Sequence, residues 1–569
     1  MTSANRVSYD IFQWDDTTWN VASDVRETFF DKDGFCFQSW VDRGWAKLIK
    51  SGSGRSIYYV QVPGLHLYVK HFEITPGAAN FYRAVRRGRA EKEYEVARLL
   101  WQSGVPTIRP LALGERRKNG LLEEAFLITE AIPNGITLFD LIEDQVRTGA
   151  IEISHPHRRE IIREIARLTA ALHAAGLEHR DLHERNLIYQ KLDGDRFRLF
   201  LVDLHELEKH RQLKWSSTVS ELARLGRYFS IRTERTDRLR FFRLYATLRG
   251  LDHKDFKQFA REVENETIES RADFWRRRDV RATNRMSGTK SILVPGGEAW
   301  AQEDIPHAFF KRFATNPESF FTTSIRHWWK RGQGTNVGAI QLDELDPHRT
   351  QVVKKYIHPP IREFIASWGR DNAATRAWKN GLALRLRELP TPRPLMLVHR
   401  YKGMLHDSSY LLTERVMPSS TIAEYLSDEI APLPENEKRR VLRGCIKRAA
   451  SLLRRMHDRR VTHHDLKATN ILATKTSDLA HPDLWLIDLD GVQTWQRIPD
   501  AALLQNIARF SVSFVGNPQL SRSDRLRFVK RYLGASSQDK QAWKELWRAI
   551  DRWASEKIQR NRRRGRAVG

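Results

Sequence analysis

The sequence repeats itself at a separation of about half its length. The motif "HRDLHERN" at 179–186 returns as "HHDLKATN" at 463–470, which is 284 residues later. The same separation joins "VPTIRPLAL" at 105–113 to "LPTPRPLML" at 389–397. Repeats in solenoids are only about 20–50 residues long. A repeat of this length therefore predicts one globular module written twice.

The predicted domain boundaries follow from this repeat. A chain of 569 residues, 41% of them hydrophobic, is long enough to bury more than one core. Between the two copies, residues 286–306 are rich in Gly and Pro, which favours turns and loops. We expect a first domain at 1–285, a linker at 286–306 and a second domain at 307–569.

Each copy reads as strands followed by helices. Residues 55–62 and 66–74 alternate like paired strands, and 90–104 have helical spacing that ends at a glycine. A long helix is predicted at 157–176, and the second copy repeats this order. The predicted class is α+β, with a small β-rich lobe and a larger helical lobe in each domain.

Three polar residues of the first copy have the order that phosphoryl transfer requires. Asp181 is followed five residues later by Asn186, and Asp203 follows a predicted strand. The first Asp accepts or orients the proton of the acceptor hydroxyl, and the other two residues hold Mg²⁺ against the phosphates of ATP. A polar turn after a helix would explain one such motif. The second copy supplies the same set, with Asp465 as the base and Asn470 and Asp488 as metal ligands.

A lysine and a glutamate upstream complete the protein-kinase-like order. Lys70 lies on a predicted strand and Glu93 on the following helix, where the pair would hold the α- and β-phosphates. Alternatively, Lys70 is an edge-strand surface residue and Glu93 an exposed helix residue. In the second copy Lys354 matches Lys70, but Ala377 stands where Glu93 is expected. Lys354 is therefore expected to lack its usual partner.

Glycine pairs precede the second strand of each copy. "SGSGRS" and "RGQGTNVG" both contain Gly-x-Gly, but Ile57 and Val337 replace the third glycine of the kinase pattern. These loops either bring backbone close to phosphates or form plain hairpin turns. The complete set predicted to bind nucleotide is Lys70, Glu93, Gly52, Gly54 and Glu130 in the first copy, with Lys354, Gly332, Gly334 and Glu414 in the second.

The motifs "YVKHF", "HRDLHERNLIY" and "LFLVDLHEL" resemble the bacterial lipopolysaccharide core kinases, the heptose and Kdo kinase family. "VVKKY", "HHDLKATNIL" and "LIDLDGV" resemble the same family. The resemblance implies a protein-kinase-like bilobal fold, ATP and Mg²⁺, and phosphorylation of a sugar hydroxyl on lipid-linked core oligosaccharide. His183 and Lys467, two residues after the catalytic Asp in each copy, are expected to stabilise charge on the transferred group.

Features that protein kinases use to bind peptides are missing from the sequence. Asp203 is followed by Leu-His and Asp488 by Leu-Asp, where protein kinases have Asp-Phe-Gly, and no Ala-Pro-Glu follows. This favours a small-molecule or glycan acceptor. An atypical protein Ser/Thr or Tyr kinase and a nucleotide-binding pseudokinase scaffold remain the alternatives.

A net charge of +26 favours an anionic partner. Basic clusters at 83–89, 274–281 and 560–566 can contact anionic lipid or sugar phosphate, or can be solvated helix ends. No nucleic-acid-binding motif is present, so we expect no such partner. The N-terminus lacks the pattern of a signal peptide, and Cys36 and Cys445 favour buried thiols in a reducing compartment. The expected location is cytoplasmic, either free or peripheral at the inner membrane.

Overall fold

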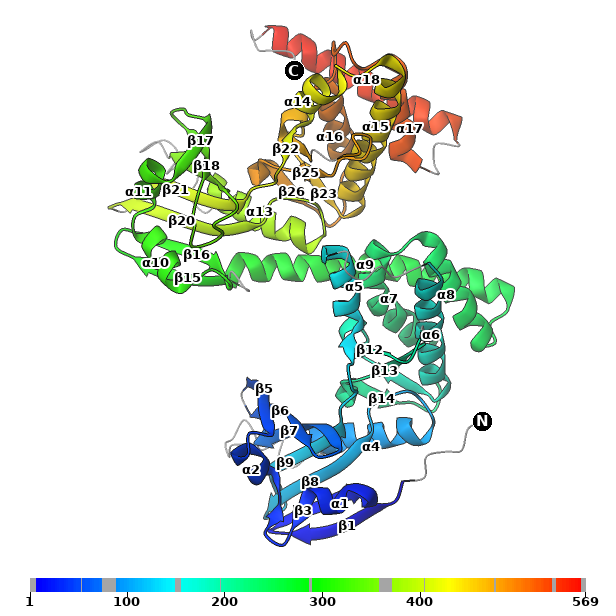
Figure 1. Ribbon diagram of the computed structural model, residues 1–569. Helices are drawn as coiled ribbons and strands as arrows, with labels where there is room; N and C mark the ends of the chain where they lie inside the picture. Colours follow the sequence, from blue (N-terminus) through cyan, green and yellow to red (C-terminus); the bar gives the residue numbers. More distant parts are fainter. Residues whose placement is uncertain are drawn as a thin grey trace. The chain divides into compact units, whose positions relative to one another are not determined.

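The chain forms two compact units, Met1–Arg271 and Ala272–Gly569, which are described separately. The structure is a computed structural model, drawn in Figure 1. It describes residues 7–52, 54–73, 88–148, 155–194, 196–285, 289–357, 371–403, 405–474, 477–534 and 539–563.

The β-rich lobe of the first unit is built on an antiparallel sheet, which has seven strands among the described residues. In spatial order the strands are β1 (Tyr9–Trp14), β2 (Thr17–Ala22), β8 (Pro110–Lys118), β9 (Leu121–Glu130), β7 (Leu65–Glu73), β6 (Arg55–Val62) and β5 (Ala46–Gly52). Shorter elements of this lobe are η1 (Ser23–Val25), α1 (Arg26–Phe29), β3 (Phe30–Asp31), β4 (Gly34–Phe35) and α2 (Phe37–Asp42). The helix α4 (Arg89–Gln102) packs against β8 and β9.

The second lobe of this unit is mainly helical. Its helices are α5 (Leu138–Thr148), α6 (His155–Ala174), α7 (Trp215–Arg232), α8 (Arg235–Leu248) and α9 (His253–Arg285). Short pieces that carry the polar motifs lie between them: β10 (Ile136–Thr137), β11 (Leu177–His179), η2 (Glu184–Asn186), β12 (Leu187–Lys191), β13 (Phe197–Leu201), η3 (Leu204–Glu206) and β14 (Leu207–Lys209). Pairing of β11 with β14 and of β12 with β13 brings the two ends of the motif region together.

The second unit repeats this arrangement. Its large sheet has the same strand order: β15 (Thr289–Val294), β16 (Gly297–Gln302), β20 (Pro394–Lys402), β21 (Leu405–Glu414), β19 (Gln351–Ile357), β18 (Thr335–Ile340) and β17 (Ile325–Lys330). The helices of this β-rich lobe are α10 (His307–Thr315), α11 (Pro317–Thr323) and α13 (Ala373–Leu386). The observed class is α+β with two protein-kinase-like bilobal units, as the sequence predicted.

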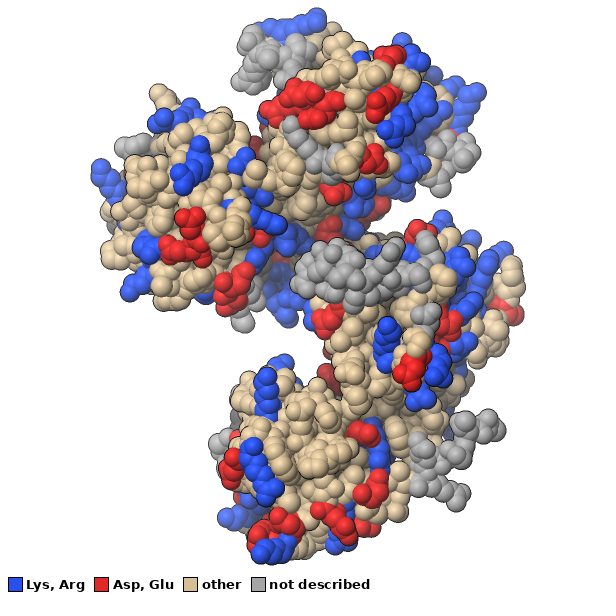
Figure 2. Space-filling model, in the orientation of Figure 1, with Lys and Arg blue, Asp and Glu red and all other residues tan. Residues whose placement is uncertain are grey.

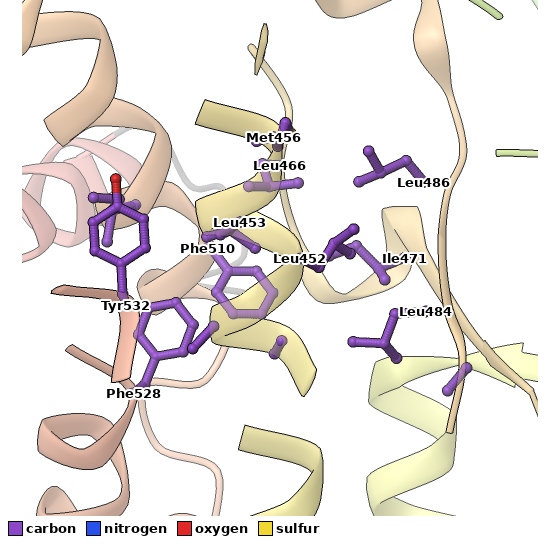
Figure 3. Packing of buried hydrophobic residues seen from close by; sticks show 14 of the residues in the cluster. Leu452, Leu453, Met456, Leu466, Ile471, Leu484, Leu486, Phe510, Phe528 and Tyr532 are labelled. Carbon is purple, nitrogen blue, oxygen red and sulfur yellow. The ribbon is translucent and has the colours of Figure 1, made fainter. Parts of the chain in front are cut away.

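The helical lobe of the second unit follows β21. Its helices are α14 (Ile422–Glu424), η4 (Tyr425–Ile430), α15 (Glu435–Asp458), α16 (Asp500–Val512), α17 (Arg522–Leu533) and α18 (Lys540–Arg563). The short elements are β22 (Ser419–Thr421), β23 (Val461–His463), η5 (Ala468–Asn470), β24 (Ile471–Thr474), β25 (Leu484–Leu486), η6 (Leu489–Gly491) and β26 (Val492–Thr494). In its core Leu453 of α15 lies beside Phe510, whereas Leu452 of the same helix lies beside Ile471 and Leu484 (Figure 3).

The predicted linker at 286–306 is wrong, because most of this segment is part of the second sheet. β15 and β16 pair across a two-residue turn at Pro295 and Gly296, and β16 continues onto β20. Gly296 has φ of +65°, which a glycine adopts without strain. The Gly and Pro content therefore marks a hairpin turn that matches the β1–β2 turn of the first unit.

The boundary between the units falls inside α9. The end of this helix belongs to the second unit, where Arg387 bonds to Asp279 with both terminal nitrogens, at 2.9 and 2.6 Å. The guanidinium of Arg387 also lies 5.1 Å from the ring of Trp275, which is buried. The basic cluster at 274–281 thus contains one buried residue, Trp275, beside the exposed Arg276, Arg277 and Arg278.

Both cysteines are free thiols of intermediate exposure, where the sequence favoured buried thiols. Burial raises the pKa of Cys36 to about 11 and that of Cys445 to about 12, so neither is a thiolate at neutral pH. No helix within the described ranges is both long enough and apolar enough to cross a membrane.

Candidate active sites

In the first unit the predicted lysine and glutamate form a buried ion pair. Lys70 Nζ on β7 lies 2.5 Å from Glu93 Oε1 on α4, and the side chain of Glu93 is 2% exposed. A buried ion pair requires good geometry, because both charges have lost their hydration. The surface alternatives for these two residues are therefore excluded.

The loop after β11 presents Asp181 beside Asn186. Asn186 Nδ2 donates to the carbonyl oxygen of Asp181 at 2.9 Å, which fixes the amide and leaves its oxygen as an acceptor. Asp181 N donates to His179 Nδ1 at 3.2 Å, so the buried ring of His179 stabilises the turn. Burial lowers the pKa of His179 to about 4 and keeps it neutral. His183 Nε2 lies 3.5 Å from Asp181 Oδ2.

Asp203 follows β13 in a left-handed conformation, with φ of +61°. His205 Nδ1 lies 2.8 Å from Asp203 Oδ1. This hydrogen bond, opposed by burial and assisted by the charge of Lys70, lowers the pKa of Asp203 to about 2. Asp203 is therefore a carboxylate throughout the physiological range and lies close enough to Lys70 to feel its charge.

A buried polar network supports the loop that carries Asp181. His173 on α6 bonds to Tyr245 OH at 2.6 Å, and its other ring nitrogen lies 3.2 Å from Glu221 Oε1. Glu221 Oε2 accepts from the backbone of His179 at 3.1 Å. Three helices of the lobe are thereby tied to the motif. Sequence analysis did not identify this network, since its members are far apart in the chain.

The glycines of the first unit differ in what they contribute. Gly54, at the tip of the β5–β6 hairpin, has φ of +75°, and a Cβ there would lie 2.9 Å from the carbonyl of Glu73. Gly52 has open space around it and no such φ. Glu130 ends β9, and its backbone N donates to the carbonyl of Arg109 at 2.9 Å, where the chain passes to the second lobe.

The second unit places its motif in the same way. Asn470 Nδ2 donates to the carbonyl oxygen of Asp465 at 2.8 Å, and Asp465 N donates to His463 Nδ1 at 3.3 Å. Lys467 Nζ lies 2.9 Å from Asp465 Oδ2, in the position that His183 occupies in the first unit. Asp488 has φ of +61°, as Asp203 has.

Lys354 has a partner that the sequence did not indicate. Its Nζ lies 2.5 Å from Asp488 Oδ1, because Ala377 leaves no carboxylate on α13. Burial alone would lower the pKa of Lys354, but Tyr356 and Asp488 more than offset burial and raise it. Lys354 therefore lacks its usual partner on the helix, as the sequence predicted, but it is not unpaired. The predicted metal ligand itself holds the lysine.

These residues of the second unit line one cleft of about 1550 Å³. Lys354 and Asp488 line it from the two lobes, and Lys467 and Asn470 of the predicted catalytic motif also line it. Gly334 and Glu414 also line the cleft, whereas Gly332 and Asp465 are not among the lining residues. Neither Gly332 nor Gly334 has a positive φ, so no strain requires glycine at these two positions.

The second unit also repeats the buried network, with one substitution. His457 bonds to Tyr532 OH at 2.8 Å and to Asn506 Oδ1 at 3.0 Å. Asn506 Nδ2 donates to the carbonyl of His463 at 2.5 Å. Asn506 thus replaces the Glu221 of the first unit. Burial lowers the pKa of His457 to about 4.

Two further candidate residues emerge from the alignment of the copies. His205 and Asp490 each stand two positions after the predicted metal-binding aspartate, and sequence reasoning used them for the resemblance and as a departure from Asp-Phe-Gly, without assigning them a role. The histidine contacts Asp203, and Asp490 lines the cleft of the second unit. The signal that could have identified them is the difference between "DLH" and "DLD".

In each unit a lysine lies on the sheet of one lobe, and an Asp, an Asn and a second Asp lie on the other lobe. This arrangement is that of a protein-kinase-like fold. A sequence model of the lipopolysaccharide kinase (Kdo/WaaP) family matches residues 40–245 and 354–532. This is more than half of the chain, and the chain belongs to that family.

Individual relatives match a smaller part of the sequence. The lipopolysaccharide core heptose(I) kinase WaaP of Pseudomonas aeruginosa is 30% identical over 164 residues, which are 27% of this chain and 59% of the relative. The 3-deoxy-D-manno-octulosonic acid kinase of Haemophilus influenzae strain 86-028NP is 26% identical, over 26% of this chain and 56% of the relative. The chain thus spans less than two thirds of these relatives.

Among solved structures, a complex of WaaP with acyl carrier protein is 23% identical and has a TM-score of 0.33, covering 44% of this chain and 98% of that one. A rhoptry antigen kinase domain of Toxoplasma gondii is 13% identical with a TM-score of 0.28, covering 38% and 81%.

Proposed function

We propose that the chain is an ATP-dependent kinase that phosphorylates a sugar hydroxyl of lipopolysaccharide core or a similar anionic glycolipid. The observation that carries the proposal is the buried Lys70–Glu93 ion pair in the same unit as Asp181, Asn186 and Asp203. Family membership supports the choice of a sugar acceptor. The named relatives act on heptose and on 3-deoxy-D-manno-octulosonic acid, and both are candidate acceptors here.

In the first unit Lys70 binds the α- and β-phosphates of ATP, and Glu93 holds the lysine in place. Asp181 accepts the proton of the acceptor hydroxyl. A bond forms between that oxygen and the γ-phosphorus, while the bond from the γ-phosphorus to the bridging oxygen breaks and ADP leaves. His183, close to Asp181, favours the negative charge of the transferred group.

The residues present fit a Mg²⁺ ion. The carboxylate of Asp203 is ionised, and the amide of Asn186 is fixed through its nitrogen, so both offer oxygen atoms. Mg²⁺ prefers such hard ligands and completes its shell with water and phosphate oxygens. When bound, Mg²⁺ neutralises charge on the β- and γ-phosphates. Asn470 and Asp488 offer the same pair of oxygens in the second unit.

The second unit resembles a pseudokinase in one respect, because its lysine is bonded to its predicted metal ligand, and this supports a separate role for the unit. The bond between Lys354 and Asp488 uses two groups that ATP and Mg²⁺ would both need. The second unit is therefore proposed to be slower, to act on a different acceptor, or to regulate the first.

We also propose a peripheral contact with an anionic membrane at its cytoplasmic face. The described parts of two basic clusters expose arginines to solvent: Arg276, Arg277 and Arg278 on α9, and Arg560, Arg562 and Arg563 on α18. The cluster at 83–89 lies largely outside the described residues. Figure 2 shows Lys and Arg side chains gathered over the helical lobe of the second unit. Each Lys or Arg near an anionic surface contributes about 1 kcal/mol.

The experiment is transfer from labelled ATP. Purified protein is incubated with extracted core glycolipid, Mg²⁺ and labelled ATP, and mass spectrometry locates the added phosphate. Phosphate on a sugar hydroxyl of the glycolipid is expected. Transfer to proteins of a lysate, with none to glycolipid, would favour an atypical protein kinase. Nucleotide binding without transfer to either would favour a scaffold.

A further inference from the structure

The two units differ at two matched positions near the phosphate-binding lysine. On the helix, Glu93 of the first unit corresponds to Ala377 of the second at the 284-residue repeat. Two residues after the metal-binding aspartate, His205 corresponds to Asp490. At these two positions each unit has one carboxylate: Glu93 on the helix in the first unit, and Asp490 two residues after the aspartate in the second.

The structure brings these two positions together in the second unit. Asn380 Nδ2 of α13 donates to the carbonyl oxygens of Leu489 and Val492, at 2.7 and 3.0 Å. Arg376 Nε donates to the carbonyl oxygen of Asp490 at 3.2 Å. The helix that carries Ala377 is thus bonded to the chain before, at and after Asp490. In the first unit the residue matching Asn380 is Val96, whose side chain cannot donate.

Asp490 also shares the cleft with the lysine. The side chains of Lys354, Ala377, Asp488 and Asp490 all line it. Asp490 and Lys354 thus lie on the wall of the same cleft, although the hydrogen bond of the lysine in this structure is made to Asp488.

The first unit shows why a second acid is needed. Asp203 bonds to His205 and not to Lys70, since Lys70 has Glu93. In protein kinases the lysine is held by an acid other than the aspartate that binds Mg²⁺, and both contacts have to be in place. When Asp488 turns to the metal, Lys354 requires another acid, and no acid can come from position 377.

We propose that Asp490 is the positioning residue of the second unit, holding Lys354 toward the phosphates in the role that Glu93 has in the first. The acid has moved from the helix to the segment after the metal-binding aspartate, and the helix position holds a small buried alanine, Ala377. The inference rests on the proposed nucleotide binding by the second unit.

The test measures nucleotide affinity, so that it does not depend on an identified acceptor. In full-length protein whose first site is silenced by Lys70→Ala and Asp203→Ala, binding of the fluorescent analogue mant-ATP with Mg²⁺ is titrated. Asp490→Asn is expected to raise the Kd about tenfold or more, the scale of a lost charged hydrogen bond. Asp551→Asn, an exposed acid on α18, is the matched control and is expected to leave the Kd unchanged.

Rescue separates positioning from a general structural effect. Adding Ala377→Glu to Asp490→Asn is expected to restore the Kd to within about threefold, because the acid returns to the helix. Thermal unfolding of each variant is followed in parallel. If Asp490→Asn lowers the unfolding temperature and Ala377→Glu restores neither affinity nor stability, the role is structural and the proposal is wrong.

The reciprocal exchange provides a second arm, in protein whose second site is silenced by Lys354→Ala and Asp488→Ala. Glu93→Ala is expected to weaken mant-ATP binding, and Glu93→Ala with His205→Asp to recover it. In protein whose first site is silenced, Asp490→Asn could leave the mant-ATP affinity unchanged while Lys354→Ala weakens it. That result would overturn the role of Asp490 but not the nucleotide binding of the second unit. If the unaltered second unit does not bind mant-ATP, the proposed function of this unit is wrong as well.

Discussion

Lys354 Nζ lies 2.5 Å from Asp488 Oδ1, whereas the corresponding Lys70 lies 2.5 Å from Glu93 on the helix. The two copies of one motif thus hold their lysines by different acids. In the first unit the lysine and the aspartate proposed to bind Mg²⁺ are separately partnered. In the second they are partners of each other, and nucleotide binding has to separate them. Differences in activity between the copies are expected to originate here.

The first prediction concerns the proposed base. Asp181→Asn keeps the shape of the side chain but removes its basicity, so transfer is expected to fall by about 10²–10⁴-fold. Labelled-phosphate transfer to core glycolipid measures it, with circular dichroism to check the fold. Asp193→Asn, in an exposed turn of the same lobe, is the control. Near-normal transfer in Asp181→Asn would assign the chemistry to the second unit.

A division of labour between the units is the second prediction. Asp203→Ala and Asp488→Ala each remove one proposed Mg²⁺ ligand, and the first is expected to cause the larger loss of transfer. The physical reason is the complete Lys70–Glu93 pair, since a misplacement of about 1 Å can cost about 10²-fold. Full activity in Asp203→Ala combined with inactivity in Asp488→Ala would reverse the ranking.

The third prediction distinguishes the two glycines of the first hairpin. Gly54→Ala forces a side chain into a left-handed conformation and places its Cβ 2.9 Å from the carbonyl of Glu73. A left-handed residue other than Gly costs roughly 1–2 kcal/mol. The free energy of unfolding of the first unit is expected to fall by at least this amount, with weaker mant-ATP binding. Gly52→Ala has open space and should behave like the unaltered protein.

A pH dependence is expected from His457 in the second unit. Burial lowers its pKa to about 4 from an ordinary value of 6.5. Between these values the unfolded chain binds a proton that the folded lobe rejects, so stability is complete above pH 6.5 and declines as the pH falls toward 4. The slope is on the order of 1 kcal/mol per pH unit. Denaturant unfolding of His457→Gln should lose this contribution, and His481→Gln, an exposed histidine, should retain it.

The last prediction is salt-sensitive binding to membranes. The protein is expected to sediment with vesicles containing anionic lipid at low salt and to be released at high salt, because exposed charges are screened beyond about 8 Å at physiological ionic strength. Replacing Arg277 and Arg278 by Gln should weaken binding. The matched control is Arg439→Gln with Arg440→Gln on α15, where Glu435 and Glu437 already partner the arginines. Equal binding to neutral vesicles would contradict the proposal.

Much of the fold, and the motifs at 179–186 and 463–470, could be predicted because they depend on the pattern of residues close together in the sequence. The turn after β11 is specified by residues close in sequence, and its repetition identified the second copy. The partner of Lys354 could not be predicted, since it lies 134 residues away and was revealed only by the packing of the two lobes. The β15–β16 hairpin was missed for another reason. Its Pro295 and Gly296 are equally typical of a linker and of a two-residue turn.

The position of the unit boundary within α9 determines how the chain can be divided. A fragment that began after this helix would keep Arg387 but lose Asp279 and Trp275, leaving a guanidinium that is 3% exposed without its carboxylate. Removing one member of a buried ion pair costs about 3–5 kcal/mol, a large share of the stability of a domain. Gene fragments for the second kinase unit should therefore start at or before Ala272, well upstream of the sequence repeat itself.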